Sequence, residues 1–525
     1  MTEQTVNMET MPLRRGHWWV LAVASMGQIL GAGLATLVGV ILPMIQLTRH
    51  PELTSWQQGL IGCTSLVGIT VGSLVFGRLS DKYGYLFFFR LCPLVVLGAS
   101  LLGYFRPELP WLVASLFLMG LGIGGGYSLD SDYISEIMPR CWRLFMVGVA
   151  KAASSIGNIL MALVCFFLLK DWDTPALWNR LLLTVAVFAL LMVLLRLRFA
   201  QSPGWLMAHG RVAEAETAVR YFLGSDVEVI GSDPDAGTEV ELPAGGRIRH
   251  HIGADIEVGE IRNRSRSRRQ KMQRQDPQQM QPQDPPKVSM ADLFRGKNLK
   301  RVIFSGIPWA CEGLGVYGIG VFLPILVMAL GLEAGVGAAD GVASGGMASV
   351  SSAVAGLQRI AHSIEITLWI NCFILPGFAL GLFLVNRWYH VRIQVWGFLL
   401  CAAGLLLLLV SYKYHLPVWT AIAGFMIFEL FLNAGPHLMT FILPSQIYPV
   451  ADRGEGAGLA AAIGKVGAVL GVLFIPMLLA RGGAELVLWV SIAVLLTGAL
   501  VTAVLGREVL PKRASLTRSV YSSNP

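Results

Sequence analysis

Charged side chains are scarce in this sequence. Asp, Glu, Lys and Arg make up 14% of its 525 residues, whereas 54% are hydrophobic. About a quarter of the residues of a soluble domain are charged, so this composition excludes a water-soluble protein and indicates a membrane protein. Only seven cysteines are present, without the spacing of a disulfide framework, and we expect free thiols.

Motifs of enzymes and metal sites are missing as well. No nucleophile stands in a pattern with a general base, and His250 and His251 have no spaced Cys or His partners. The run GLGIGG, 120–125, has the spacing of a nucleotide-binding loop, but it lies inside an apolar segment, where glycines indicate close helix packing. We therefore expect no enzyme, no metal site and no cofactor.

Long apolar runs are what the sequence does contain. A membrane-spanning helix needs about 20 mostly apolar residues. The runs are continuous and do not alternate at period two, which favours helices over a β-barrel. We predict an all-α membrane protein with twelve transmembrane helices in two groups of six. The expected helices are 18–45, 57–77, 88–105, 111–133, 144–169 and 178–199, then 302–330, 363–385, 393–411, 417–441, 454–479 and 484–505.

The two groups carry a repeated phrase. SEIMPRCWR, 135–143, and SQIYPVADR, 445–453, share the pattern S-[E/Q]-I-x-P-x-x-x-R and stand 310 residues apart. Gly157 and Gly467 match at the same offset. Duplication of a six-helix unit explains these matches, and transporters built from such halves bind substrate at mid-depth between them. We expect two bundles, 1–199 and 302–506, a linker, 200–301, and a tail, 507–525.

The linker decides the expected topology. Its stretch 261–287 is rich in Arg, Gln and Pro and too polar to form a core, so its middle is expected to be disordered. The basic linker and both termini fall on one side of the membrane, which the positive-inside rule makes the cytoplasm of a plasma or inner membrane. Without interleaved aromatics the stretch does not indicate nucleic-acid binding. We expect a monomer whose partners are the bilayer and a small molecule.

Charged and polar residues gather at the predicted cytoplasmic ends of the helices. Carboxylates and guanidinium groups there can bridge helices when this side is shut and separate when it opens. A second interpretation is that they only set topology in the headgroup zone. The predicted cytoplasmic gate comprises Asp81, Lys82, Asp130, Asp132, Glu136, Arg143, Asn386, Arg387, Gln446 and Arg453.

Several of these motifs resemble the major facilitator superfamily. GRLSDKYG, 77–84, is similar to its signature loop, and QSPGWLMAHGRVAEAETAV, 201–219, resembles the sugar-porter segment after helix 6, which implies short helices in 200–220. The segment 433–468 resembles the phosphate:proton symporters in its N-x-G-P, T-F-x-x-P and G-K-x-G-A elements. The resemblance covers nearly all of both halves and implies the major facilitator fold.

Resemblance to the phosphate symporters extends to site residues, with departures. Tyr127, Trp309, Tyr317 and Lys465 match that family's pattern, whereas the proton-handling carboxylates mostly do not. Where that family has Asp in helices 4 and 7, this sequence has Gly126 and Gly313, and where it has Glu in the P-[A/S]-E loop, this sequence has Gln446. The family's Gln in helix 5 corresponds to Ser154, and helix 1 of this sequence contains no Asp. The resemblance therefore carries over the scaffold but not phosphate as the substrate.

The depth of charged residues along the helices indicates a binding site independently of the family resemblance. Lys465 lies about 16 Å into its helix, near the midplane, and Glu312 and Glu429 lie at similar depth. Charges at that depth normally face a cavity, and burial favours the neutral form of a carboxylic acid, so such a group can exchange a proton. Lys151, nearer the cytoplasmic end, can reach water by snorkelling. The alternative is a Lys465–carboxylate pair that only holds helices together.

We predict a secondary transporter that works by alternating access, best interpreted as proton-coupled symport of a small anion or organic acid. The expected substrate-binding residues are Tyr127, Ser154, Trp309, Tyr317, Asn433 and Lys465, and the expected proton-coupling residues are Glu312 and Glu429. One alternative is a sugar-type uniporter or exporter of a neutral solute. Another is a membrane receptor or scaffold that signals through 220–300 and does not transport.

Overall fold

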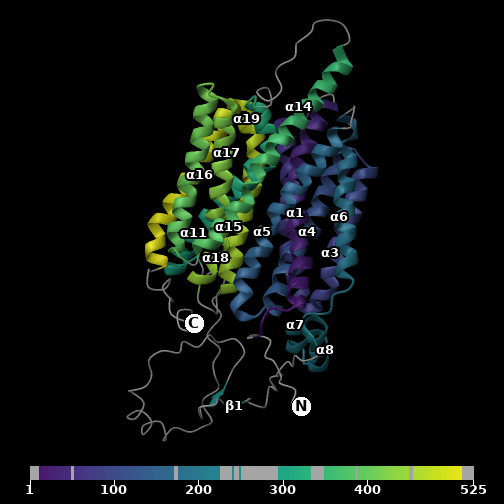
Figure 1. Cartoon of the computed structure of the whole chain (residues 1–525), viewed down its shortest axis with the longest axis vertical. Helices are drawn as coiled ribbons and strands as arrows, with labels where there is room; N and C mark the ends of the chain where they lie inside the picture. Colours follow the sequence, from purple (N-terminus) through teal and green to yellow (C-terminus); the bar gives the residue numbers. More distant parts are fainter. Residues whose placement is uncertain are drawn as a thin grey trace.

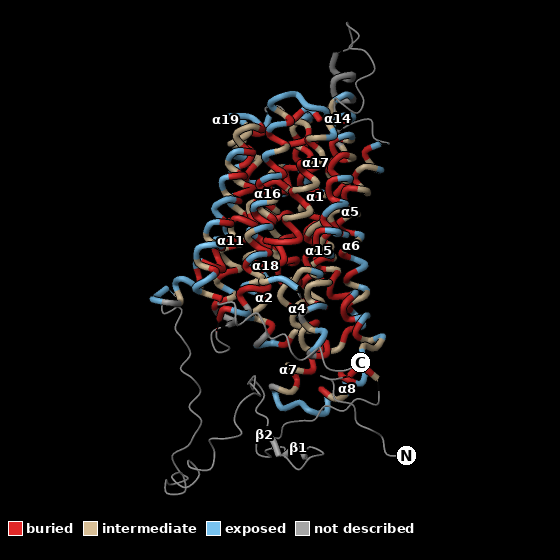
Figure 2. The backbone as a smooth tube through the Cα atoms, turned by 60° about the vertical axis from the view of Figure 1, so that its left-hand side comes forward, coloured by how far each residue is buried: buried red, intermediate tan, exposed pale blue. Residues whose placement is uncertain are grey.

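The apolar runs of the sequence form long, roughly parallel helices in the computed structural model of the protein (Figure 1). Buried residues fill the space between the helices, and exposed residues lie along the outer rim of the bundle (Figure 2). The part of the chain that the structure describes comprises residues 11–48, 52–170, 175–224, 239–241, 247–249, 294–332, 348–385, 387–448 and 453–510.

The first half contains six membrane-spanning segments. Their bounds are α1 (Arg15–Thr48), α2 (Ser55–Tyr83), α3 (Tyr85–Phe105), α4 (Leu109–Ile137), α5 (Arg140–Lys170), and the 3₁₀ turn η1 (Pro175–Arg180) leading into α6 (Leu181–Arg196). Small residues let these helices approach closely. A side chain at Gly120 or Gly124 of α4 would meet a backbone oxygen of α2 at 2.1 Å, which confirms that the glycine run serves helix packing.

The second half also spans six times, but several of its segments are interrupted. Its elements are α11 (Gly296–Gly313), the π-helical turn η3 (Leu314–Ile319), α12 (Leu323–Ala329), α14 (Ala348–Asn371), α15 (Ile374–Val385), α16 (His390–Lys413), α17 (Val418–Ala434), α18 (Pro436–Ile447) and α19 (Arg453–Val509). Pro376 and Pro436 lack the N–H that would continue the preceding helix, which fits the breaks before them. Glycines Gly313, Gly315, Gly318 and Gly320 fall in or beside η3.

α19 is two spans joined by a tight turn. Gly482 and Gly483 leave the helical conformation, and Gly483 has φ +64°, which favours glycine. Eleven stretches of the described chain are long and apolar enough to cross a membrane, and the last, Gly456–Val509, contains this turn. The described residues therefore form twelve spans, and the predicted all-α membrane fold of two six-helix halves is confirmed.

Between the halves lie short elements at the end of the bundle where α1 begins and α19 ends. They are α7 (Pro203–Ala208), α8 (Val212–Leu223) and a two-stranded antiparallel ribbon of β1 (Glu239–Glu241) and β2 (Arg247–Arg249) (Figure 1). We call this end of the bundle the tail end and the opposite end the far end. The short helices α7 and α8 lie where the sugar-porter resemblance implies them.

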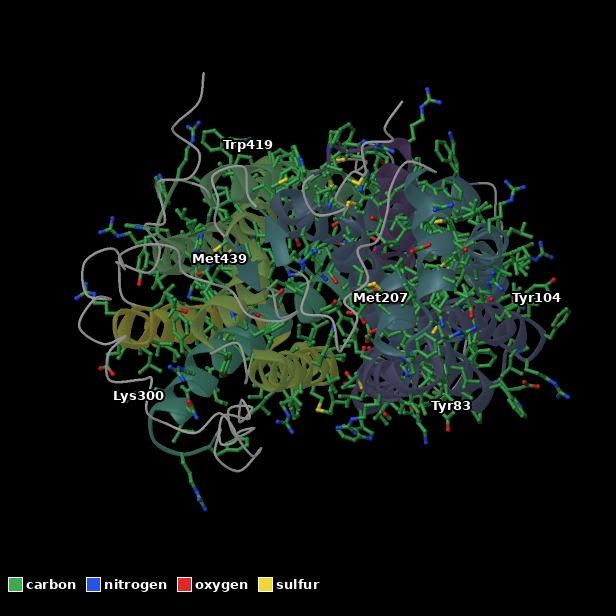
Figure 3. All side chains as sticks on the ribbon, turned by 90° about the horizontal axis from the view of Figure 1, so that it is seen from below. Tyr83, Tyr104, Met207, Lys300, Trp419 and Met439 are labelled. Atoms are coloured by element: carbon green, nitrogen blue, oxygen red, sulfur yellow. The ribbon has the colours of Figure 1, made fainter. Side chains whose placement is uncertain are left out.

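Seen from the tail end, the helices of the two halves form two groups side by side (Figure 3). At the far end their small residues meet. A side chain at Gly39 of α1 would meet the carbonyl oxygen of Val321 at 2.1 Å, and one at Gly59 of α2 would meet that of Leu473 at 2.3 Å. Nearer the tail end α5 approaches α15, since a side chain at Gly148 would lie 3.2 Å from a side-chain carbon of Leu382. The halves thus enclose a space between these two levels.

Candidate functional site

A polar cavity of about 60 Å³ lies between the two halves. α1, α4 and α5 of the first half line it, together with η3, α14, α15, α17 and α18 of the second. In an otherwise apolar bundle this is the place where a polar solute finds hydrogen-bonding partners.

Two lysines from different halves approach the same ring of this cavity. The Nζ atoms of Lys151 (α5) and Lys465 (α19) each lie 5.8 Å from the centre of the Tyr127 ring. Lys465 also donates to the Tyr317 hydroxyl at 3.4 Å, and Lys151 donates to Oε1 of Gln28 at 3.5 Å. The sequence interpretation of Lys151 as a snorkelling residue is therefore wrong, because its side chain lines the central cavity.

The sequence repeat relates the cavity residues of the two halves. Adding the offset of 310 to Tyr127 gives His437, and both residues line the cavity. Adding it to Lys151 gives Ala461, which is four residues before Lys465. Residues four apart on a helix share a face. The two lysines therefore occupy equivalent helix faces, one turn apart in depth.

Two carboxylic acids of the second half are buried in or beside the cavity wall. Glu312 of α11 hydrogen-bonds to Nδ1 of His437 on α18, and the two side chains are 2% and 6% exposed. Glu429 of α17 lines the cavity, and its Oε2 accepts from the amide of Asn433 at 3.3 Å. Asn433 also donates to the backbone oxygen of Glu429 at 2.8 Å. Each acid is thus buried and held by one neighbouring polar side chain.

The remaining predicted substrate residues differ in their distance from the cavity. Ser154 lines it and donates to the backbone oxygen of Lys151 at 2.7 Å. Trp309 packs against Phe441, with ring centres 5.0 Å apart, and Phe441 in turn lies 4.9 Å from Nζ of Lys151. Trp309 therefore supports the ring beside the lysine and is not among the lining residues.

The predicted gate residues make contacts within their own halves. Glu136 accepts from the Ser202 hydroxyl and from N–H of Gly204 at 3.3 Å, which ties α4 to the start of α7. Gln446 contacts Nδ1 of His390 at 2.9 Å. Lys82 lies over the Tyr83 ring and Arg387 over the Phe383 ring. The side chains of Asp81 and Arg453, and all of Asn386, lie outside the described part of the chain.

Asp130, another predicted gate residue, has a different setting from the rest. It forms a buried ion pair with Arg196 of α6, N···O 2.5 Å, inside the first half. Asp132 and Arg143 each make polar or electrostatic contacts too.

Sequence reasoning missed three residues: Lys151 as a cavity residue, His437 and Arg196. For His437 a signal was present, namely its position 310 residues after Tyr127. For Arg196 there was none, because it ends α6 and looks like an ordinary topology charge.

Comparison with known protein families supports the fold and the architecture of halves. Residues 21–233 match a family model described as sugar (and other) transporter. The chain is 25% identical to the inner membrane metabolite transport protein YgcS of Escherichia coli, over 96% of this chain and 94% of that protein. It is 22% identical to the niacin transporter NiaP of Acinetobacter baylyi (96% and 97%) and 23% identical to a repressible high-affinity phosphate permease of Neurospora crassa (89% and 79%).

Solved structures give the same fold. The chain matches the xylose transporter XylE of Escherichia coli in a partially occluded inward open conformation with a TM-score of 0.64 at 16% identity. The match covers 92% of this chain and 98% of that one.

Proposed function

We propose that this chain, which is a transporter of the major facilitator superfamily related to the phosphate and sugar porters, carries a small anion or organic acid together with protons. The bundle holds the cavity between its halves, and alternating access opens it first to the far end and then to the tail end. We place both termini in the cytoplasm, from the basic tails and linker. The transporter acts as a monomer in the plasma or inner membrane.

One observation carries the proposal: two ammonium groups converge on the wall of one cavity. Lys151 lines the cavity, and Lys465 lies behind the lining residues Tyr127 and Tyr317. A charge near the middle of the membrane costs about 3 kcal/mol or more unless it is compensated. Among the described residues neither Lys151 nor Lys465 forms an ion pair, and their polar partners are the amide oxygen of Gln28 and the hydroxyl of Tyr317. A bound anion supplies the compensating charge that these neutral partners lack.

Coupling to protons is supported by the two buried acids. Glu312 and His437 can share one proton between them, because either group can hold it while the other accepts the hydrogen bond. Glu429 adds a second ionisable group at the cavity wall. Protonation neutralises each acid, so that its carboxylate no longer competes with an anionic substrate for the lysines.

A neutral solute is the alternative within transport. The match to a sugar transporter model favours it, but a sugar carries no charge to pair with either ammonium group. A non-transporting scaffold leaves the polar cavity without a role.

Transport by the reconstituted protein tests the proposal. We expect uptake of labelled nicotinate or inorganic phosphate into proteoliposomes with an alkaline interior, and no uptake of xylose. Lys465→Gln and Lys151→Gln should each lower uptake by about tenfold or more, since a hydrogen bond to a charged group contributes about 1.5 kcal/mol or more.

Lys300→Gln is the matched control, because Lys300 is 55% exposed and pairs with Glu508 at the bundle surface. The proposal would be overturned in favour of a neutral solute if the protein takes up xylose, and if this uptake is unchanged by both cavity substitutions and by collapse of the pH gradient.

A further inference from the structure

A second ionic site lies in the first half, outside the substrate cavity. Nη2 of Arg196 on α6 donates to Oδ1 of Asp130 on α4 at 2.5 Å, and the two side chains are 0% and 2% exposed. The Arg196 guanidinium also lies over the Phe89 ring of α3, 3.8 Å from its centre. Arg196 therefore joins three helices of this half from within.

The sequence explains why the guanidinium sits there. In a helix the carbonyl of Phe89 would accept from the N–H of the residue four positions later, but that residue is Pro93, which has no N–H. The free carbonyl accepts instead from Nη1 of Arg196 at 3.0 Å. Arg196 is thus held by a carbonyl, a ring and a carboxylate, of which only the carboxylate can change its charge.

Asp130 is satisfied on one side only. Its Oδ2 is buried and has no hydrogen-bond partner among the described residues. The space around Oδ2 exists because the facing residue of α1 is Gly27, where a Cβ would come within 2.0 Å of this oxygen. Gly126 of α4 borders the same space, since its Cβ would lie 3.7 Å from Oδ2. Burial of a charged oxygen without a donor is costly, and adding a proton removes that cost.

Asp130 is also placed beside the transport route. It follows Tyr127 by three residues, which is about one helical turn toward the tail end. Tyr127 lines the cavity. The ionisable groups that act on Asp130 are Arg196 and Cys92 from α6 and α3, and Tyr127 and Asp132 from its own helix. α1 faces it with Gly27, which has no side chain.

We propose that Asp130 is a second proton-binding site of the transport cycle, located in the first half between the anion cavity and the tail end. A proton from water forms an O–H bond at Oδ2 and leaves the carboxyl group neutral, while Arg196 keeps its charge and its bond to Phe89. Release of the proton to water restores the ion pair, and no electron is transferred. The site rests on the proposed proton coupling only for its role in transport; its protonation can be measured without any substrate.

The alternative is a purely structural clamp between α4 and α6. A clamp stays ionised at every pH at which the protein is folded. A proton-binding site changes its charge within the pH range in which the protein is folded. A change in the protonation of Asp130 with pH therefore distinguishes the two.

Infrared difference spectroscopy of the full chain in lipid vesicles, titrated from about pH 5 to about pH 9 without substrate, makes this distinction because a protonated carboxyl group has its own carbonyl band. We expect a band that appears as pH falls and that is absent from the double variant Asp130→Asn with Arg196→Gln, which removes both charges together. The matched control is Glu214→Gln with Arg211→Gln, an exposed pair at the start of α8 with side chains 58% and 49% exposed, and it should keep the band.

Identical bands in the wild type and the Asp130 double variant would overturn the proposal, as would no band change in the wild type. Should the double variant fail to fold, Arg196→Lys serves in its place, because it keeps the positive charge but not the three-way contact. This variant should shift the pH at which the band reaches half of its intensity. An unchanged midpoint would contradict the assignment of the band to Asp130. These results do not depend on Lys465 or on the identity of the anion, so they stand apart from the test of the proposed function.

Discussion

Gly59 provides a sharp test of alternating access. A Cβ at this position would lie 2.3 Å from the carbonyl oxygen of Leu473, whereas ordinary contact begins at 3.4 Å. Gly59→Val therefore forces α2 and α19 apart by about 1 Å, the difference of these distances, when the far end is closed. Overpacking of this kind costs about 1–3 kcal/mol, which shifts the population toward a far-end-open state by about 5-fold to 150-fold.

The protein carries a native reporter for this shift. Cys63 lies one turn after Gly59 on α2 and is 5% exposed in the closed arrangement. In a background of Cys141→Ser and Cys372→Ser, which removes the two exposed thiols, Gly59→Val should raise labelling of Cys63 by an impermeant maleimide about fivefold or more. Gly98→Val is the matched control, because a Cβ at Gly98 meets nothing within 4 Å. Equal labelling rates in the two variants would refute closure of the far end through this contact.

Three further substitutions test the site and the fold. Glu312→Gln cannot release a proton, so uptake driven by an imposed pH gradient should be lost while the protein still purifies as a folded species; a normal pH-driven uptake would remove Glu312 from coupling. His437→Ala leaves the buried Glu312 without its partner and should lower the free energy of unfolding by about 1–3 kcal/mol in thermal or denaturant unfolding in detergent. His362→Ala, at an exposed pair with Glu365, should cost less than about 1 kcal/mol, and equal losses in the two would contradict the burial argument. Gly483→Ala should cost about 1–2 kcal/mol, because φ is +64° there, whereas Gly98→Ala should cost nothing measurable in the same assay.

Much of the fold could be predicted from the sequence, because membrane helices are recognised by length and apolarity alone. The repeat at an offset of 310 residues identified the two halves. What could not be predicted were the interruptions of the second half, since η3 and the break between α14 and α15 lie within continuous apolar runs. Pro376 and Pro436 were available signals for two of the breaks, but many prolines, such as Pro43 of α1, lie inside unbroken helices.

The cavity was less predictable than the fold, as Lys151 illustrates. The expected helix 5 began at 144, which placed Lys151 about 10 Å from its end and within snorkelling reach. The helix in fact begins at Arg140, which places Lys151 one turn deeper, about 16 Å from that end. His437 was overlooked because an isolated histidine has no spacing that marks its partner, and Glu312, its partner, is 125 residues away in the chain. Contacts of that kind depend on the packing of helices and not on local pattern.

The structure of the protein with its transported anion bound would test the central claim most directly. If nicotinate or phosphate is carried, its anionic oxygens should lie about 3 Å from Nζ of both Lys151 and Lys465, beside the Tyr127 ring. An anion bound elsewhere in the bundle, with Lys465 still donating only to Tyr317, would contradict the account.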